Sequence, residues 1–184
     1  MESSNAGLFV GGTAYGAKRN TGSLQALWPA ALTAAMRNQY FFPLVIELKS
    51  QFDGDTAVAA RATDILATYD GPAALMSFDP DLVAAVRHLA PRLPRGITME
   101  HRYDDPEWDM LPPARKFAWG NLLHFPRTRP DFLAHYVKEL PSAPVSLARR
   151  AFRLPVLTWT VRTPEDRALA ARHADQMIFE GFLP

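Results

Sequence analysis

The sequence predicts an α/β fold with a parallel sheet, and three observations lead to this prediction. Short apolar runs typical of buried strands alternate with stretches of helical periodicity, in the order strand, helix, strand, helix, strand. Helix-start signals follow several of these runs, with a capping residue directly before a proline. One run, Leu44–Lys49, is rich in β-branched residues and then becomes charged where a helix signal follows. Such alternation indicates right-handed crossovers between parallel strands.

Length and composition indicate one globular domain that is long enough to bury a core. The 184 residues are 48% apolar and 21% charged, and their net charge of +1 gives no reason to expect nucleic acid or an anionic membrane. The chain has no cysteine, which excludes disulfides, zinc–thiolate sites and thiol nucleophiles. We expect a cytoplasmic protein, because the N-terminus lacks the features of a secretory signal and no apolar run approaches the ~20 residues of a membrane span.

The first half of the chain begins irregularly and then becomes regular. Residues 1–22 are rich in Gly, Ser, Asn and Thr, which predicts a loop. Later, Asp79-Pro80 combines an N-cap with a proline at the first helical position. The predicted elements are a helix over 24–35, a strand over 44–49, a helix over 55–69, a strand over 73–78, a helix over 80–89 and a strand over 97–100.

The second half interrupts this alternation and then resumes it. Residues 101–108 are polar and predict a loop, and residues 125–130 predict an extended segment. Thr163-Pro164-Glu165-Asp166 predicts a capping box that opens a helix. The other predicted elements are a helix over 107–121, a strand over 131–137, a helix from about Pro144, a strand over 156–161, a helix over 164–173 and a strand over 174–180.

Two opposite charges, Glu47 and Lys49, mark the end of the first strand. Residues two apart on a strand share a face, so Val45, Glu47 and Lys49 point the same way. Charge at the end of a buried strand, just before a βα loop, is typical of the place where α/β barrels hold their active site. The alternative is an ion pair at a strand end, and the residues by themselves leave both readings open.

Other polar residues are weaker candidates for a site. Glu100 ends a strand on the edge where catalytic groups are expected, and His135 alternates with apolar neighbours, which favours a structural histidine. His101 and His124 have no partner at ligand spacing, which favours surface or loop roles. Asp55 is better explained as a helix cap than as a metal ligand.

Five stretches together resemble the C-terminal two-thirds of a bacterial glycerophosphodiester phosphodiesterase, over roughly residues 43–184. They occur in the family's order and include a Glu-x-Lys strand and a Trp-Thr-Val strand. The stretches are Leu44-Val-Ile-Glu-Leu-Lys49, Met76-Ser-Phe-Asp-Pro80, Pro94-Arg-Gly96, Leu157-Thr-Trp-Thr-Val-Arg162 and Ala174-Asp-Gln-Met-Ile-Phe179.

The resemblance implies a partial TIM-type (β/α) barrel of the phospholipase-C-like phosphodiesterase type, with about five of eight βα units. It implies hydrolysis of glycerophosphodiesters to glycerol 3-phosphate and an alcohol, in lipid metabolism, with Ca²⁺ or Mg²⁺ as the cation. By resemblance, Glu47 is a metal ligand, Lys49 contacts the phosphate and Trp159 lines the substrate end of the barrel. Carboxylate oxygens suit a hard cation, and an ammonium stabilises charge on a phosphodiester oxygen.

The chain also departs from the family pattern. The family's catalytic histidine pair and its Glu-x-Asp metal pair precede the Glu-x-Lys strand, yet none of the five histidines here precedes Glu47, and residues 1–42 contain one acidic residue, Glu2. Phe179-Glu180 stands where the family commonly has Thr-Asp. We therefore expect residues 1–42 to be an irregular lead-in that does not match the family, and the chain to be a truncated, inactive version of the enzyme.

Two further expectations follow. The alternative function is a non-catalytic module for phosphate or glycerophosphate binding, or for assembly. A barrel without its first strands leaves open sheet edges. We therefore expect dimerisation, poor solubility or closure by the N-terminal segment.

Overall fold

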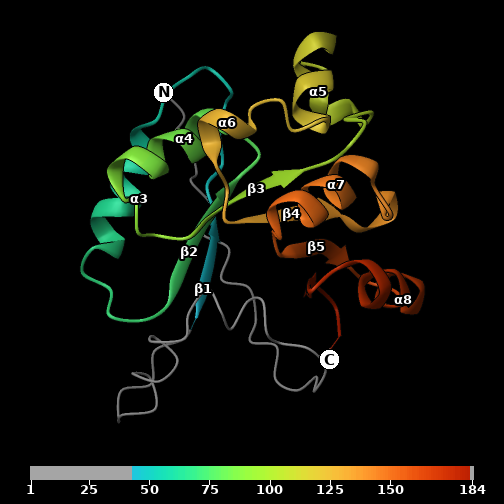
Figure 1. Ribbon diagram of the computed structural model, residues 1–184. Coiled ribbons are helices and arrows are strands. Elements are labelled where there is room, and N and C mark those ends of the chain that lie inside the picture. The colour runs from blue at the N-terminus through green and yellow to red at the C-terminus, as the bar shows by residue number, and fades with distance from the viewer. Residues whose placement is uncertain (1–42, 183–184) are drawn as a thin grey trace. The chain divides into compact units, whose positions relative to one another are not determined.

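The computed structural model describes residues 43–182, which fall into two compact units, 43–97 and 98–182. The predicted lead-in over 1–42 and its helix over 24–35 lie outside the described residues. Strands and helices alternate through both units, and strand β3 runs across the boundary between them (Figure 1). Each unit is described by itself.

The first unit consists of three parallel strands and two helices. Its elements are β1 (Leu44–Glu47), α3 (Ala57–Leu66), β2 (Ala73–Ser77), α4 (Pro80–Leu89) and β3 (Arg95–Met99). β1 pairs with β2 from Leu44 opposite Ala73 to Glu47 opposite Met76, and β2 pairs with β3. Helices α3 and α4 lie side by side (Figure 1). The predicted order of elements is confirmed here.

The core of the first unit lies between this sheet and its helices. Every residue of β2 is buried, as expected for a strand with neighbours on both sides. Burial of each large apolar side chain contributes roughly 1.5–3 kcal/mol. The core cluster comprises Leu48, Ala59, Leu75, Leu82 and Val86.

The start of α4 confirms the predicted cap. Asp79 has an extended backbone, its side chain accepts a hydrogen bond from the N–H of Asp81, and Pro80 occupies the first helical position. The start of α3 differs from the prediction. Thr56 is its N-cap residue, and Asp55 instead accepts a hydrogen bond from the N–H of Ala57 just outside the helix.

The second unit pairs three further parallel strands. Among its described residues, β4 pairs with β5, and β5 pairs with β6 through an irregular register between Thr158 and Val161. Its elements after β3 are η1 (Pro106–Trp108), α5 (Pro113–Gly120), α6 (Phe125–Thr128), β4 (Phe132–Tyr136), η2 (Val137–Glu139), α7 (Ala143–Phe152), β5 (Val156–Val161), α8 (Pro164–His173) and β6 (Gln176–Phe179).

The structure corrects the prediction for this unit in two places. The helix predicted over 107–121 is divided into η1 and α5, because Pro112 and Pro113 interrupt it and a proline is tolerated only in the first turn of a helix. The segment 125–130 is not fully extended, since it contains the one-turn helix α6. The helix stops at Arg129, which has a left-handed backbone with φ of 41°.

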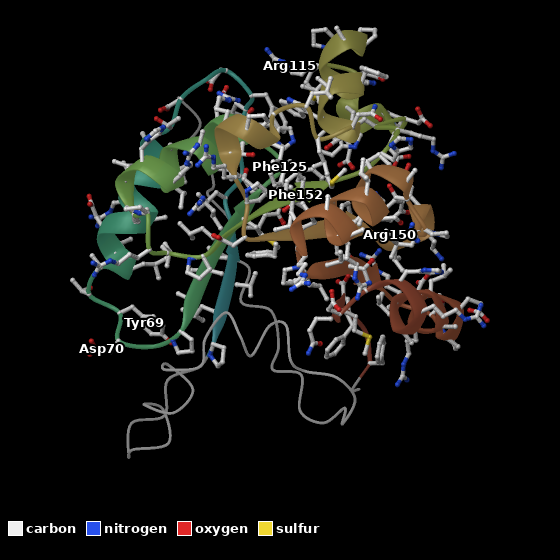
Figure 2. The ribbon with its side chains drawn as sticks, viewed as in Figure 1. Tyr69, Asp70, Arg115, Phe125, Arg150 and Phe152 are labelled. Carbon is white, nitrogen blue, oxygen red and sulfur yellow. The ribbon has the colours of Figure 1, made fainter. Side chains whose placement is uncertain are left out.

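The short helix α6 is held to α7 by an aromatic contact. Figure 2 shows the rings of Phe125 and Phe152 together, and their centroids are 4.5 Å apart in a stacked arrangement. Phe152 is nevertheless 58% exposed, so the pair is only partly withdrawn from water. The contact between residues far apart in sequence explains why local propensity did not reveal α6.

The capping box at the start of α8 is confirmed. Thr163 accepts a hydrogen bond from the N–H of Asp166, and Asp166 in turn accepts from the N–H of Thr163. Lys138 reaches the Asp166 carboxylate at 2.6 Å, although Asp166 is almost fully buried. The ion pair between Lys138 and Asp166 therefore links the start of α8 to the segment that follows β4.

No helix among residues 43–182 combines the length and the apolar character that crossing a bilayer requires.

Candidate functional site

Glu47 and Lys49 lie at the carboxyl end of β1. The Lys49 ammonium is 2.7 Å from Glu47 Oε1, which makes an ion pair between residues two apart on one face, as predicted. The Lys49 side chain is 54% exposed and the Glu47 side chain 18% exposed. An ammonium this accessible can meet a dissolved anion, and the ion pair itself contributes little to stability.

Leu48, between the two charges, points the other way. Its side chain is buried in the core cluster, whereas Glu47 and Lys49 are on the opposite face. The N–H of Leu48 donates to the carbonyl of Met76 at 2.7 Å, which continues the pairing of β1 with β2 by one residue. The charged pair therefore sits on a rigid strand end rather than in a loose loop.

Polar residues that the sequence did not single out as site residues surround this strand end. Ser77 Oγ donates to the carbonyl of Leu48 at 2.7 Å, and Ser50 Oγ donates to Asp79 Oδ2 at 2.5 Å. Ser77 and Asp79 are each 1% exposed. Serines in a loop and at a strand end carry no pattern of their own, and the pairing of β1 with β2 places Ser77 and Asp79 beside Leu48 and Ser50, the two neighbours of Lys49.

Trp159 belongs to the second unit, on β5. Its indole N–H donates to the carbonyl of Ala134 at 2.9 Å, which fixes the orientation of the ring. The ring of Tyr136, opposite it in the register, lies 5.1 Å away at an interplanar angle of 31°. The half-buried pair presents aromatic surface, and Tyr136 is a neighbour that the sequence did not indicate.

Glu100 follows β3 and is 4% exposed. The pKa of Glu100 is raised to about 7, mainly by burial and also by neighbouring carboxylates, chiefly Glu139, while a hydrogen bond from Trp108 opposes this rise. Oxygen atoms of Glu100, Asp105 and Glu107 lie within 4.8 Å of one another, although the last two side chains are exposed. This is the one carboxylate group of that kind among residues 43–182, and it does not include Glu47.

The side chains of residues 43–182 therefore do not form a complete divalent-cation site at Glu47. Ca²⁺ and Mg²⁺ require several oxygen ligands, and here one carboxylate shares its oxygen with an ammonium.

His135 is completely buried in the second unit. Its Nδ1 lies 2.9 Å from the carbonyl of Tyr136, which assigns the ring proton to Nδ1, and its Nε2 lies 3.9 Å from Glu139 Oε2. Burial lowers the pKa of His135, so the ring is neutral at neutral pH. These features fit the structural role expected of this histidine.

Glu139 ties the segment after β3 to the segment after β4. Its carboxylate accepts hydrogen bonds from the N–H of His101 and from the N–H and side chain of Arg102. Burial alone would raise the pKa of Glu139, but these donors outweigh it and hold the pKa below its usual value.

Two further histidines, His101 and His124, are also held locally. His101 Nδ1 lies 3.2 Å from the carbonyl of Gly120, where any larger residue would overlap the His101 carbonyl. His124 Nδ1 lies 3.1 Å from the Thr128 hydroxyl, and burial lowers the pKa of His124 to about 4. His124 is half-buried in the turn before α6, so of the surface and loop roles expected for it the loop role fits.

Comparisons with known proteins give a consistent result for the fold. The chain matches no family model and no curated protein. Among solved structures, it is similar to one assigned as a glycerophosphoryl diester phosphodiesterase from Silicibacter pomeroyi, with a TM-score of 0.57 and 23% identity over 80% of this chain and 50% of that one. In fold, the chain matches part of a glycerophosphodiester phosphodiesterase.

Two further structures agree. A phosphodiesterase from Oleispira antarctica, solved with the product sn-glycerol 3-phosphate, has a TM-score of 0.56 and 17% identity over 75% of this chain and 51% of that one. A glycerophosphodiester phosphodiesterase from Thermotoga maritima has a TM-score of 0.50 and 20% identity over 74% of this chain and 53% of that one.

These similarities confirm the predicted fold class, an α/β fold of partial TIM-barrel type, and the predicted resemblance. The chain spans about half the length of the glycerophosphodiester phosphodiesterases that it matches. At these identities the similarity concerns the fold, and the roles of single residues remain proposals.

Proposed function

We propose that this chain belongs to the glycerophosphodiester phosphodiesterases, which are phosphoric diester hydrolases. We also propose that the chain itself does not hydrolyse a glycerophosphodiester. The observation that carries the proposal is the Glu47–Lys49 pair at the carboxyl end of a parallel strand, where barrels of this kind hold substrates. Lys49 is proposed to contact the phosphate. Trp159 is proposed, as a separate contact, to pack against the glycerol carbons.

The proposed lack of turnover has two chemical reasons. Glu47 is proposed as a single metal ligand, and one carboxylate does not hold Ca²⁺ or Mg²⁺ tightly. The family's histidine pair has no counterpart before Glu47, so the ~10²–10⁴-fold contribution of proton transfer is missing. His135 does not replace it in this proposal, because its Nε2 is fully buried.

A second function is favoured by the accessibility of Lys49. A non-catalytic module that binds phosphate or glycerol 3-phosphate needs an exposed cation on a rigid support, and it needs neither a metal nor a proton donor. Lys49 has this exposure, and its neighbours are hydrogen-bonded. The module retains binding without hydrolysis, whereas an inactive fragment of the hydrolase that has also lost its substrate contacts retains neither.

Calorimetric titration with glycerol 3-phosphate separates the two functions. We expect saturable binding in the millimolar range, about 4 kcal/mol, and its loss in Lys49→Ala. Lys138→Ala is the matched control, because Lys138 is similarly exposed (52%) and is paired with Asp166 at 2.6 Å. Absence of binding by the unmodified chain would count against the binding module.

Hydrolysis is tested with glycerophosphocholine in the presence of Ca²⁺ or Mg²⁺. We expect no release of glycerol 3-phosphate. Turnover that disappears in Glu47→Ala would contradict the proposed inactivity and would identify a working enzyme.

A further inference from the structure

We infer that Ser50, Ser77 and Asp79 are positioning residues that set the direction of the Glu47–Lys49 pair. We call these three residues the serine–aspartate clamp. The inference rests on the proposed function of the pair, and it assigns a role to residues outside that pair.

The clamp acts first on the residue before Lys49. Regular pairing of β1 ends at Glu47, yet both backbone polar groups of Leu48 are hydrogen-bonded. Its N–H donates to the carbonyl of Met76 at 2.7 Å, and its carbonyl accepts from Ser77 Oγ at 2.7 Å. The Ser77 hydroxyl thus stands where a backbone donor would continue the ladder. It extends the fixed part of the strand by one residue.

The clamp acts second on the residue after Lys49. Ser50 Oγ donates to Asp79 Oδ2 at 2.5 Å and accepts from the N–H of Phe52 at 2.8 Å. The Asp79 carboxylate is itself fixed, because the N–H of Asp81 donates to its other oxygen at 2.8 Å. Hydrogen bonds to a buried carboxylate are among the stronger ones in proteins.

Lys49 therefore stands between two tethered neighbours. Leu48 and Ser50 are both held toward the end of β2, and alternation along the chain directs Lys49 to the other face beside Glu47. A lysine on a fixed backbone loses less conformational freedom when it binds an anion than a lysine in a mobile loop. Such preorganisation is useful at a binding site.

Helix capping alone does not account for the clamp. Asp79 caps α4 through Oδ1, and that bond requires neither Ser50 nor the second carboxylate oxygen. The Ser77 hydroxyl accepts from the N–H of Asp79 at 3.0 Å, and it also donates to the carbonyl of Leu48 at the end of β1. The bonds toward Leu48 and Ser50 are therefore additional to the cap, and they converge on the segment that carries Lys49.

The test measures glycerol 3-phosphate binding by Ser50→Ala and Ser77→Ala in the full chain. Each variant removes a tether and leaves Glu47, Lys49 and the Asp79 Oδ1 cap of α4 in place, and Ser77→Ala also removes the acceptor of the Asp79 N–H. We expect the affinity to fall by about tenfold, the scale of ordering one additional flexible side chain on binding. Ser50→Thr, which keeps the hydroxyl, is expected to restore binding.

Ser142→Ala is the matched control. Ser142 is also buried, at 4% exposure, but its hydroxyl has no hydrogen-bond partner among the described residues. Equal loss of binding in this control would point to general destabilisation and would overturn the inference. Unchanged binding in both Ser50→Ala and Ser77→Ala would overturn it as well.

A ligand-free measurement separates failure of the clamp from failure of the proposed ligand. Nuclear Overhauser contacts between the Lys49 and Glu47 side chains report the direction of the pair. If the unmodified chain does not bind glycerol 3-phosphate, loss of these contacts in Ser50→Ala still supports the clamp. Their persistence in both serine variants contradicts it.

Discussion

Glu100 shows how burial changes the chemistry of a single residue. Its carboxyl is almost completely buried, and its pKa is raised to about 7 from 4.5. At pH values between about 4.5 and 7, the folded state therefore keeps a proton on Glu100 that the unfolded chain has already released. This residue makes the fold less stable as the pH rises from about 4.5 to 7, and its effect is constant above that range.

The Glu100→Gln variant tests this effect. We expect the variant to gain about 1–3 kcal/mol of unfolding free energy relative to the unmodified chain between pH 5 and pH 8, because an amide cannot ionise. Urea unfolding at both pH values measures the difference. Glu107→Gln, at an exposed neighbour, should show no such gain, and an equal gain there would contradict the assignment to Glu100.

At the level of elements, Asp175 joins α7, β5 and the entry to β6. Its carboxylate lies 2.5 Å from Arg149 Nη2 and accepts from the N–H of Val156 at 2.8 Å, while Arg149 also donates to the carbonyl of His173. The Asp175 side chain is 17% exposed. One half-buried carboxylate thus organises three segments.

Replacing Asp175 by Asn should cost about 1–3 kcal/mol of unfolding free energy, since a charged partner of an arginine and of a buried N–H is lost. Glu180→Gln is the control. Glu180 also pairs with an arginine, at 2.7 Å from Arg162, but both side chains are more than 60% exposed. Exposed pairs contribute at most about 1 kcal/mol. Chemical denaturation compares the two, and an equal cost would contradict the role given to Asp175.

The order of elements was largely predictable, because strands such as Val156–Val161 are short apolar runs and the Asp79 and Thr163 caps are local signals. Helix α6 was not predictable, since it depends on a ring contact with distant Phe152. The Glu47–Lys49 pair was predictable from alternation on one strand. The bonds to the neighbouring residues Leu48 and Ser50 were not, because only the pairing of β1 with β2 brings Ser77 and Asp79 to them.

At the scale of the whole molecule, the strands at the ends of the sheet order are the places where we propose association. Among the described strands, β1 and β6 each pair on one side only, and all their residues are half-buried. Strands with one open side recruit other strands. We therefore propose that the chain self-associates, through β6 in particular, where Met177 and Phe179 pack on the core of the second unit and Ile178 between them is apolar and only half-buried.

Sedimentation velocity over a range of concentrations tests this proposal. We expect concentration-dependent dimers, weakened in Ile178→Lys, because lysine on an edge strand opposes pairing. Phe117→Lys is the control, since Phe117 is apolar and 65% exposed but lies on helix α5. A monodisperse monomer, or equal weakening by the control, would contradict association through β6.

The position of Glu47 at the end of β1 has a consequence for how binding and assembly affect each other. A strand added to the open side of β1 would lie about 4.8 Å from the backbone that carries Glu47 and Lys49. Any anion held by Lys49 would then meet the incoming polypeptide directly. Coupling between two bound ligands is reciprocal. If the added strand changes the affinity for the anion by some factor, the anion therefore changes the affinity for the strand by the same factor.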